Sequence, residues 1–262
     1  MAFHPLPLQH WPRQAREGIV GIFTDIDDTL TTEGTITPAA LQALSNLKAR
    51  GLHVIPITGR PVGWSAPFAH TWPVDAIVAE NGAVALTGSP TQRLYQQDAP
   101  TRERHFQRMQ AVLERIEREV PGARRSQDST GRETDIAIDH SEFTHLAERD
   151  IQRVVGLMQE EGMTATVSSI HINGWYGEHD KFKGACWIAR ELLGRDLTQE
   201  LDRWVYVGDS TNDQVMFQHF PHSMGVANIQ RFAQALTYPP RYVTPSERGE
   251  GFAEVARALL AT

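Results

Sequence analysis

Two aspartates, Asp25 and Asp27, directly follow the apolar run at residues 19–23 and have the clearest potential for chemistry. The run is typical of a buried parallel strand, and open α/β sheets place their ligands at the carboxyl ends of such strands. Side chains two positions apart on an extended chain point the same way, so both carboxylates can face one small site. Carboxylates that close repel each other unless a proton or cation lies between them, and an oxygen-binding cation such as Mg²⁺ meets this need.

This acidic stretch, taken alone, has two other interpretations. Asp-rich turns are commonly solvated loops or helix caps, and the stretch by itself leaves that possibility open. An EF-hand calcium loop also begins with spaced aspartates, but it needs Gly at its sixth position and Glu at its twelfth. Counted from Asp25, those positions hold Leu30 and Ile36, so the sequence excludes an EF-hand.

Further polar clusters follow two other predicted strands. Thr58 comes directly after the buried strand predicted at residues 52–57, and a right-handed strand–helix–strand crossover places it at the same sheet edge as Asp25. The apolar strand predicted at residues 204–207 also breaks into a polar run. The candidate residues of that run are Asp209, Asn212 and Asp213. We expect these side chains to meet the two aspartates at one edge of the sheet.

Lysine is rare in this chain, which has three lysines and 22 arginines. Two of the three, Lys181 and Lys183, lie close together just before a predicted helix. An ammonium group is a compact charge on a flexible stem, whereas a guanidinium group is a rigid planar fork. The pair therefore indicates that an ammonium group is needed at this point, and either lysine could supply it.

Together, these clusters supply the functions that phosphoryl transfer requires. One carboxylate can attack as a nucleophile to form an acyl phosphate, and a second can protonate the leaving oxygen and later deprotonate water. A divalent cation, a lysine and a hydroxyl can stabilise the charge on the transferred group. Each cluster is common by itself, and their shared position at strand ends predicts this chemistry.

The strand–helix alternation that positions these residues is interrupted once, at about residues 88–180. There the order changes to helix, two strands, helix, two strands. Amphipathic helices are predicted at residues 101–120 and 142–161, because apolar residues recur there every three or four positions. We interpret this segment as an inserted α+β (αββαββ) cap domain.

The remaining chain predicts an α/β core with a Rossmann-like parallel sheet. The core is discontinuous and consists of residues 1–87 and 181–262. Residues 1–17 are proline-rich and aperiodic, and we expect them to form an arm that lies on the surface.

Composition limits the classes of partner. The 262-residue chain has a net charge of −7 and a sequence pI near 5.9, which argues against general binding to nucleic acids or anionic membranes. The single cysteine, Cys186, rules out an intrachain disulfide framework and is typical of a reducing compartment. Because no secretion signal or membrane-spanning run is evident, we expect a cytoplasmic protein. The expected partner is a small molecule.

These motifs resemble those of haloacid dehalogenase (HAD) superfamily phosphatases over nearly the whole chain. Asp25-Ile26-Asp27-Asp28-Thr29 is similar to the family's first motif, DxDxT, and Thr58 is similar to its second. One of the two lysines corresponds to the third motif. The fourth motif, GDSxND, is matched by Gly208-Asp209-Ser210-Thr211-Asn212-Asp213. The Asn81-Gly82-Ala83 turn and the αββαββ insertion resemble the type IIB (C2B-capped) branch. That branch includes Cof-like sugar phosphatases and the sucrose-, trehalose- and mannosylglycerate-phosphate phosphatases.

The resemblance implies a role for each motif residue. Asp25 would be the nucleophile and Asp27 the acid and base, and Thr58 and Lys183 would stabilise the phosphoryl group. Lys183 is favoured over Lys181 because a Lys-Gly pair precedes the helix in that branch. Mg²⁺ would be held by Asp25, the Asp27 carbonyl and Asp209. The expected supporting residues are Thr29, Gly59, Asn212 and Asp213.

Two cap residues, His171 and Asn173, are candidates for contact with the substrate. They lie on the last strand of the insertion, shortly before the lysine pair, and closure of a cap would bring such groups onto the leaving group. The remaining histidines are interpreted as surface or core-edge residues, and Arg60 as a residue that solvates the sheet edge.

The favoured function is Mg²⁺-dependent hydrolysis of a small phosphorylated metabolite, a sugar phosphate, through an aspartyl-phosphate intermediate. A sugar phosphomutase would use the same site but return the phosphoryl group to the sugar, and the sequence leaves this alternative open. A non-enzymatic phospho-accepting regulatory domain also pairs acidic residues with a threonine and a lysine on a parallel sheet. The large insertion and the second acidic strand end at Asp209 count against that domain.

Overall fold

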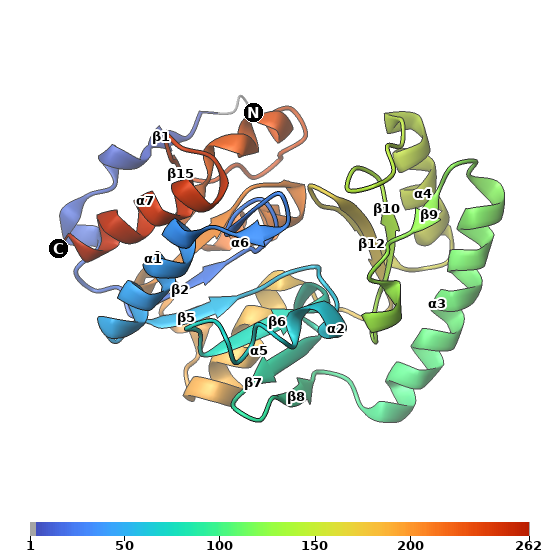
Figure 1. The fold of residues 1–262 in the computed structure, drawn as a ribbon, viewed down its shortest axis with the longest axis horizontal. Helices are drawn as coiled ribbons and strands as arrows, with labels where there is room; N and C mark the ends of the chain where they lie inside the picture. Colours follow the sequence, from blue (N-terminus) through green and yellow to red (C-terminus); the bar gives the residue numbers. More distant parts are fainter. Residues whose placement is uncertain (1–3, 262) are drawn as a thin grey trace.

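A six-stranded parallel sheet forms the centre of the core (Figure 1). The computed structural model describes residues 4–261. In spatial order the strands are β1 (Leu6–Pro7), β15 (Tyr242–Val243), β14 (His222–Gly225), β13 (Trp204–Gly208), β2 (Gly21–Thr24) and β5 (His53–Pro56). The predicted parallel sheet is therefore confirmed, and β2 and β13, which precede the two acidic clusters, lie side by side within it.

Helices cover both faces of this sheet. Successive strand residues alternate between two apolar layers, so that Ile22 and Val54 belong to one layer and Phe23 and Ile55 to the other. Helices α1 (Pro38–Ala49) and α7 (Arg248–Leu260) pack on the first face. Helices α5 (Lys181–Leu193) and α6 (Gln214–His219) pack on the second. Burial on both faces explains why these strands are continuously apolar in the sequence.

The helix boundaries follow local capping chemistry. Thr37 caps α1, since its hydroxyl accepts a hydrogen bond from the Ala40 amide and Pro38 occupies the first turn. Asp180 caps α5 by accepting from the Lys183 amide, and Gly194 ends that helix in the left-handed conformation. The Asp180 cap starts α5 at Lys181, which decides which lysine turns toward the sheet.

The N-terminal arm is more than a surface segment. Its strand β1 pairs in parallel with β15 and extends the sheet by one strand. Trp11 is buried and packs near His222 and Tyr242. The arm therefore completes the hydrophobic layer at one edge of the core.

A second, antiparallel sheet continues the core beyond β5. Its strands are β6 (Ala76–Ala79), β7 (Val84–Thr87) and β8 (Gln92–Tyr95), and an Ile57–Val78 bridge joins it to the end of β5. Because β8 pairs with β7 along its whole length, residues 92–95 extend the core sheet. We therefore propose that the cap begins between β8 and the next helix and not at residue 88.

The cap has the predicted order of helix, two strands, helix, two strands. Its elements are α3 (Ala99–Glu119), β9 (Arg124–Arg125), β10 (Ile136–Asp139), α4 (Glu148–Glu160), β11 (Thr164–Val167) and β12 (His171–Trp175). The two helices pack on the side of the antiparallel sheet β11-β12-β10-β9 that faces away from the core (Figure 1). Helix α4 begins six residues later than predicted, because the Asp139 carboxylate accepts four backbone N–H groups and holds residues 141–144 in a loop.

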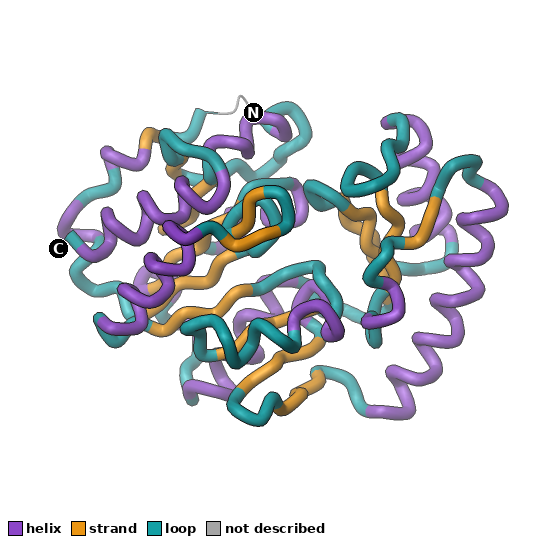
Figure 2. The backbone as a smooth tube through the Cα atoms, in the orientation of Figure 1, coloured by secondary structure: helices purple, strands orange, loops and turns teal. Residues whose placement is uncertain are grey.

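Short elements complete the fold, and Figure 2 shows them among the loops. Strands β3 (Thr31–Thr32) and β4 (Thr35–Ile36) form a hairpin beside the acidic turn, and α2 (Val62–Ser65) follows β5. The 3₁₀ turns are Leu8–His10, Arg13–Ala15, Glu80–Gly82, Ser129–Gly131, Leu197–Gln199, Leu201–Arg203, Thr211–Asp213 and Ala227–Phe232. Within residues 4–261, no helix combines the length and the apolarity that crossing a bilayer would require.

Gly21 is predicted to be sensitive to the smallest possible enlargement. A Cβ atom at this position of β2 would overlap the Trp204 ring, whose neighbours leave it no room to move. Gly21→Ala is therefore expected to lower the free energy of unfolding by about 1–3 kcal/mol. Urea denaturation followed by tryptophan fluorescence measures this change.

The Gly18→Ala variant is the control, because no atom lies within 4 Å of the Cβ position at residue 18. It should change the free energy of unfolding by less than about 0.5 kcal/mol. Equal stabilities of the two variants would contradict the packing argument.

Candidate active site

The carboxyl ends of β2, β5 and β13 bring the predicted residues together at one sheet edge. Asp25 follows β2 and donates its backbone N–H to the Val207 carbonyl, which ties it to the end of β13. Thr58 and Asp209 follow β5 and β13 in the same way. All three side chains are buried. The juxtaposition expected from the crossover connections is present.

Lys181 occupies the centre of this edge, so the prediction that favoured Lys183 is wrong. The Lys181 Nζ atom lies 2.6 Å from Asp25 Oδ1 and 2.7 Å from Asp213 Oδ1, and its side chain is 1% exposed. The Lys183 side chain is 53% exposed, and its recorded ion-pair contact is to Glu178 at 3.9 Å. Two residues along an α-helix correspond to a rotation of roughly 200°, so only one of the two lysines can face the sheet.

Two carboxylates of a cluster of three contact this ammonium group. Oxygen atoms of Asp25, Asp209 and Asp213 lie within 4.8 Å of one another. Burial, followed by the charge of Asp213, overcomes the influence of Lys181 and raises the pKa of Asp25 to about 8, and burial with the neighbouring aspartates raises the pKa of Asp209 well above its usual value. One lysine does not balance three buried carboxylates, so the cluster favours binding of an additional cation.

The hydrogen bonds of the three aspartates show which of them have oxygen atoms available to bind such a cation. Asp213 is saturated, because Oδ1 accepts from Lys181 and Tyr206 and Oδ2 accepts from the backbone N–H groups of Asp209 and Ser210. Asp209 differs, since Oδ2 accepts from Asn228 but Oδ1 is buried and has no hydrogen-bond partner among residues 4–261. An orphaned carboxylate oxygen fits a metal ligand, so Asp25 and Asp209 can hold the ion while Asp213 positions Lys181.

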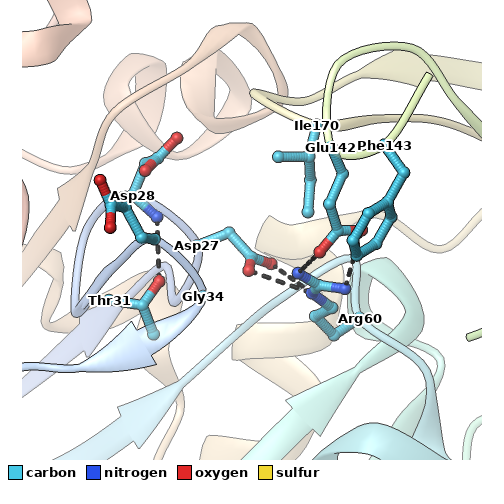
Figure 3. Close-up of a pocket in the computed structure, with 9 residues that line it drawn as sticks. Asp27, Asp28, Thr31, Gly34, Arg60, Glu142, Phe143 and Ile170 are labelled. Carbon is cyan, nitrogen blue, oxygen red and sulfur yellow. Dashed lines mark hydrogen bonds and ion pairs between the residues drawn. The ribbon is translucent and has the colours of Figure 1, made fainter.

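Arg60, interpreted from the sequence as a solvated residue, is buried and binds the second aspartate of the motif. Its Nε atom lies 3.0 Å from both carboxylate oxygens of Asp27. Its Nη atoms contact two cap residues, Glu142 at 2.7 Å, as Figure 3 shows, and Asp128 at 3.2 Å. The interpretation of Arg60 as a solvated residue is therefore wrong. The sequence did contain one signal for its position, because Arg60 lies two residues after Thr58 and this spacing puts both side chains on one side of an extended chain.

The environment of Asp27 suits proton transfer. Burial raises its pKa above the ordinary value, and the opposing charge of Arg60 does not cancel this effect. A carboxyl group with a raised pKa holds a proton closer to neutral pH and can donate it to a leaving oxygen. Asp27 and Asp25 thus have separate partners, Arg60 and Lys181, at the same sheet edge.

The supporting residues predicted from the motifs lie at this edge with different contacts. The Thr58 Oγ1 atom accepts from the Arg60 amide at 3.0 Å, which leaves its hydroxyl hydrogen free to donate. The Thr29 hydroxyl is buried without a partner among the described residues. Asn212 accepts from the Ser210 hydroxyl and thereby orders the turn after β13. Gly59 offers its carbonyl to cap side chains.

His171 and Asn173 lie on β12, as predicted, but both are engaged within the polar contact between cap and core. His171 Nε2 lies 3.0 Å from Glu142 Oε2. The Asn173 amide donates to Asp135 and to the Gly59 carbonyl. Neither side chain is among those that line the cavity beside Asp27. The cavity-lining residues on the cap are Glu142, Phe143 and Ile170.

A buried carboxylate, Glu80, fixes the cap onto the core and was not recognised in the sequence. It accepts hydrogen bonds from the amides of Val62, Glu133 and Thr134 and from the Thr134 hydroxyl. Because Val62 belongs to the core and residues 133 and 134 to the cap, one side chain links the two parts. Its position directly before the Asn81-Gly82 turn is the only sequence signal that could have indicated this role.

Residues 22–118 match the family model of haloacid dehalogenase-like hydrolases. A comparison with curated proteins gives no match.

Among solved structures, a protein of Thermoplasma acidophilum is similar with a TM-score of 0.73 and 18% identity, covering 93% of this chain and 99% of that one. The sucrose-phosphatase of Synechocystis sp., solved in complex with sucrose and phosphate, has a TM-score of 0.66 and 14% identity, with 92% and 97% covered. A HAD-superfamily phosphatase of Bacteroides thetaiotaomicron has a TM-score of 0.63 and 14% identity, with 96% and 98% covered.

These identities establish a shared fold, and the family model adds a match in sequence over the first two motifs. Over residues 22–118 the chain is thus similar in sequence to the haloacid dehalogenase-like hydrolases, and over more than nine-tenths of its length it shares the fold of the solved structures.

Proposed function

We propose that this protein is a Mg²⁺-dependent phosphomonoesterase that hydrolyses a small phosphorylated metabolite, a sugar phosphate, through an aspartyl phosphate on Asp25. The observation that carries the proposal is the buried Lys181 bridge between Asp25 and Asp213, with Asp27 held separately by Arg60. The match of residues 22–118 to the model of the haloacid dehalogenase-like hydrolases and the similarity in fold to sucrose-phosphatase support the reaction class and the sugar-phosphate substrate.

Asp25 and Asp209, with the Asp27 carbonyl, would hold the magnesium ion. The buried, unpartnered Oδ1 of Asp209 supports this assignment. When bound, Mg²⁺ would supply positive charge opposite the oxygens of the transferring phosphoryl group. It would also favour the ionised forms of Asp25 and Asp209, whose pKa values are raised mainly by burial and further by neighbouring aspartates.

The side chains of this protein would carry out two successive displacements at phosphorus. An Asp25 oxygen forms a bond to phosphorus while the bond to the leaving oxygen breaks, and Asp27 gives its proton to that oxygen. Asp27, now a carboxylate stabilised by Arg60, then takes a proton from water as the water oxygen attacks phosphorus and frees Asp25. Lys181 and the Thr58 hydroxyl stabilise charge around the transferring group.

A phosphomutase would share the first displacement but return the phosphoryl group to the sugar in the second. The products distinguish the two activities, because hydrolysis releases inorganic phosphate and a mutase yields an isomeric sugar phosphate. A regulatory phospho-acceptor would retain one phosphate per chain and would not turn over.

Replacement of the nucleophile gives the first test. Asp25→Asn is expected to keep the fold but to lower the turnover of p-nitrophenyl phosphate and of sugar phosphates by several orders of magnitude, since an amide cannot form the acyl phosphate. Phosphate release is the measurement, with circular dichroism to confirm folding. Asp202→Asn is the control, because Asp202 is exposed and precedes β13 at the end opposite the site. Activity of the Asp25 variant above a few per cent would refute the assignment.

Metal dependence gives the second test. EDTA is expected to abolish phosphate release and Mg²⁺ to restore it, whereas Ca²⁺ should restore it poorly because Ca²⁺ prefers longer and less octahedral coordination. Asp209→Asn should weaken the activation and raise the Mg²⁺ concentration needed for half-maximal rate. Undiminished activity in excess chelator would contradict the proposed metal site.

The two lysines give a matched pair for the third test. Lys181→Met is expected to reduce kcat by about 10²–10³ on every substrate, because its charge acts on the group common to all of them. Lys183→Met should stay within about twofold of wild type, since that side chain is exposed. Removing one partner of a buried ion pair costs roughly 3–5 kcal/mol, so thermal melting must show that the Lys181 variant is folded at the assay temperature. Similar losses in the two folded variants would overturn the assignment of Lys181.

A further inference from the structure

A cavity of about 350 Å³ lies beside Asp27, between the core and the cap. Its core walls are the acidic turn, Arg60 and the β3–β4 hairpin, and its cap walls are the loop that carries Glu142 and Phe143, together with Ile170 (Figure 3). Asp27 is the proposed proton donor to the leaving oxygen. Under the proposed function, on which this inference rests, the leaving group of the substrate therefore occupies this cavity.

The cavity lining carries an excess of negative charge. Apart from Asp27, which would carry the proton for the leaving oxygen, its acidic members are Asp28, Glu33 and Glu142, and its only cationic member among residues 4–261 is Arg60. Arg60 is already shared by Asp27 and Glu142 within the cavity and by Asp128 behind it. No cationic side chain in the lining is thus left to pair with an acid group on the leaving portion of a substrate.

Glu33 adds a carboxylate at the mouth that has no ion pair within the described part of the chain. It stands at the tip of the two-residue β3–β4 hairpin, where Glu33 and Gly34 have φ values of 51° and 75°. Positive φ at both central residues is typical of a type I′ turn, which holds a hairpin tip in a defined direction. By contrast, Asp28 is paired with Arg248 at 3.1 Å.

Hydrogen-bonding chemistry points to the same class of ligand. Ionised carboxylates can only accept hydrogen bonds, so a ligand that binds Glu33 and Glu142 must present donors, either hydroxyl or ammonium groups. Phe143, which is 63% exposed, and Ile170 add an apolar surface on the cap side. Clefts with an apolar wall and a few converging polar groups are typical of small-molecule sites.

We propose that this cavity selects phosphate esters whose leaving group is an uncharged or cationic polyol, and that it disfavours leaving groups carrying a carboxylate or a second phosphate. Glu33 is the specificity-determining residue at the mouth, and Glu142 is its counterpart on the cap. Lys181, with a cation held by Asp25 and Asp209, would compensate the phosphoryl charge that all substrates share, whereas the hairpin and the cap loop act on the remainder of the substrate.

Two matched substrate pairs isolate the charge of the leaving group. Glucitol 6-phosphate and 6-phosphogluconate are both linear and differ by a hydroxymethyl group and a carboxylate. Glucose 6-phosphate and glucosamine 6-phosphate differ by a hydroxyl and an ammonium group. We expect kcat/KM to be about tenfold lower for 6-phosphogluconate than for glucitol 6-phosphate, and equal or higher for glucosamine 6-phosphate than for glucose 6-phosphate. For any ester that is not turned over, the inhibition constant against p-nitrophenyl phosphate replaces kcat/KM.

The Glu33→Gln variant tests the residue. In this variant, the ratio of kcat/KM for glucitol 6-phosphate to that for 6-phosphogluconate should be about two- to fivefold smaller than in the wild type. In the wild type, raising the ionic strength from about 0.02 to 0.5 M should also reduce this ratio, because exposed charges are screened. Glu103→Gln is the control, since Glu103 is exposed on α3 and outside the cavity, and its ratio should equal that of the wild type.

The outcomes separate this inference from the proposed function. Failure to hydrolyse p-nitrophenyl phosphate with Mg²⁺ present would refute the phosphatase itself. If p-nitrophenyl phosphate is hydrolysed but 6-phosphogluconate is used or bound as well as glucitol 6-phosphate, the phosphatase stands and the charge selection is refuted. If neither Glu33→Gln nor added salt changes the ratio of kcat/KM for glucitol 6-phosphate to that for 6-phosphogluconate, the role of Glu33 is refuted.

Discussion

The buried ammonium group of Lys181 is the interaction on which the arrangement of the active site depends. It bridges Asp25, at the end of β2, and Asp213, in the turn after β13, and so fixes these two neighbouring strands of the sheet relative to each other. A buried charge is costly unless it is paired and hydrogen-bonded, and this lysine has two carboxylate partners. Asp213 in turn accepts the amides of Asp209 and Ser210, so the same contact shapes the turn that presents Asp209.

The cap is joined to this edge by a second set of buried charges. Glu80 receives amides from both sides of the boundary, and Arg60 and Arg132 reach across it to Glu142 and the Gly59 carbonyl. Glu80 adopts a left-handed backbone conformation, with φ of 49°, which costs roughly 1–2 kcal/mol in a residue other than glycine. Its hydrogen bonds offset that cost. The cavity beside Asp27 therefore has walls whose relative position is set by specific polar contacts.

The two ends of the proposed site differ in what can balance their carboxylates. Lys181 and the orphaned oxygen of Asp209 lie where a phosphoryl group and a cation would bind, whereas Glu33 and Glu142 lie where the leaving group would be. Arg60 stands between them and stabilises the carboxylate form of Asp27. Under the proposed function, Lys181 and an added cation would offset the charge of the phosphoryl group, whereas Arg60, the cationic residue of the cavity lining within residues 4–261, is already paired with carboxylates.

The sequence by itself determined the parallel core, the inserted cap and the set of strand-end residues. Apolar strands that break into polar residues, such as the one before Asp25, leave little choice of position, because parallel strands share one carboxyl edge. Only the tertiary structure decided between Lys181 and Lys183, since the choice depends on where the Asp180 cap starts α5. It also decided the roles of Arg60 and Glu80, whose partners are up to 82 residues away in the chain. A charged side chain carries no local mark of such a partner, because burial and pairing arise only when distant segments pack together.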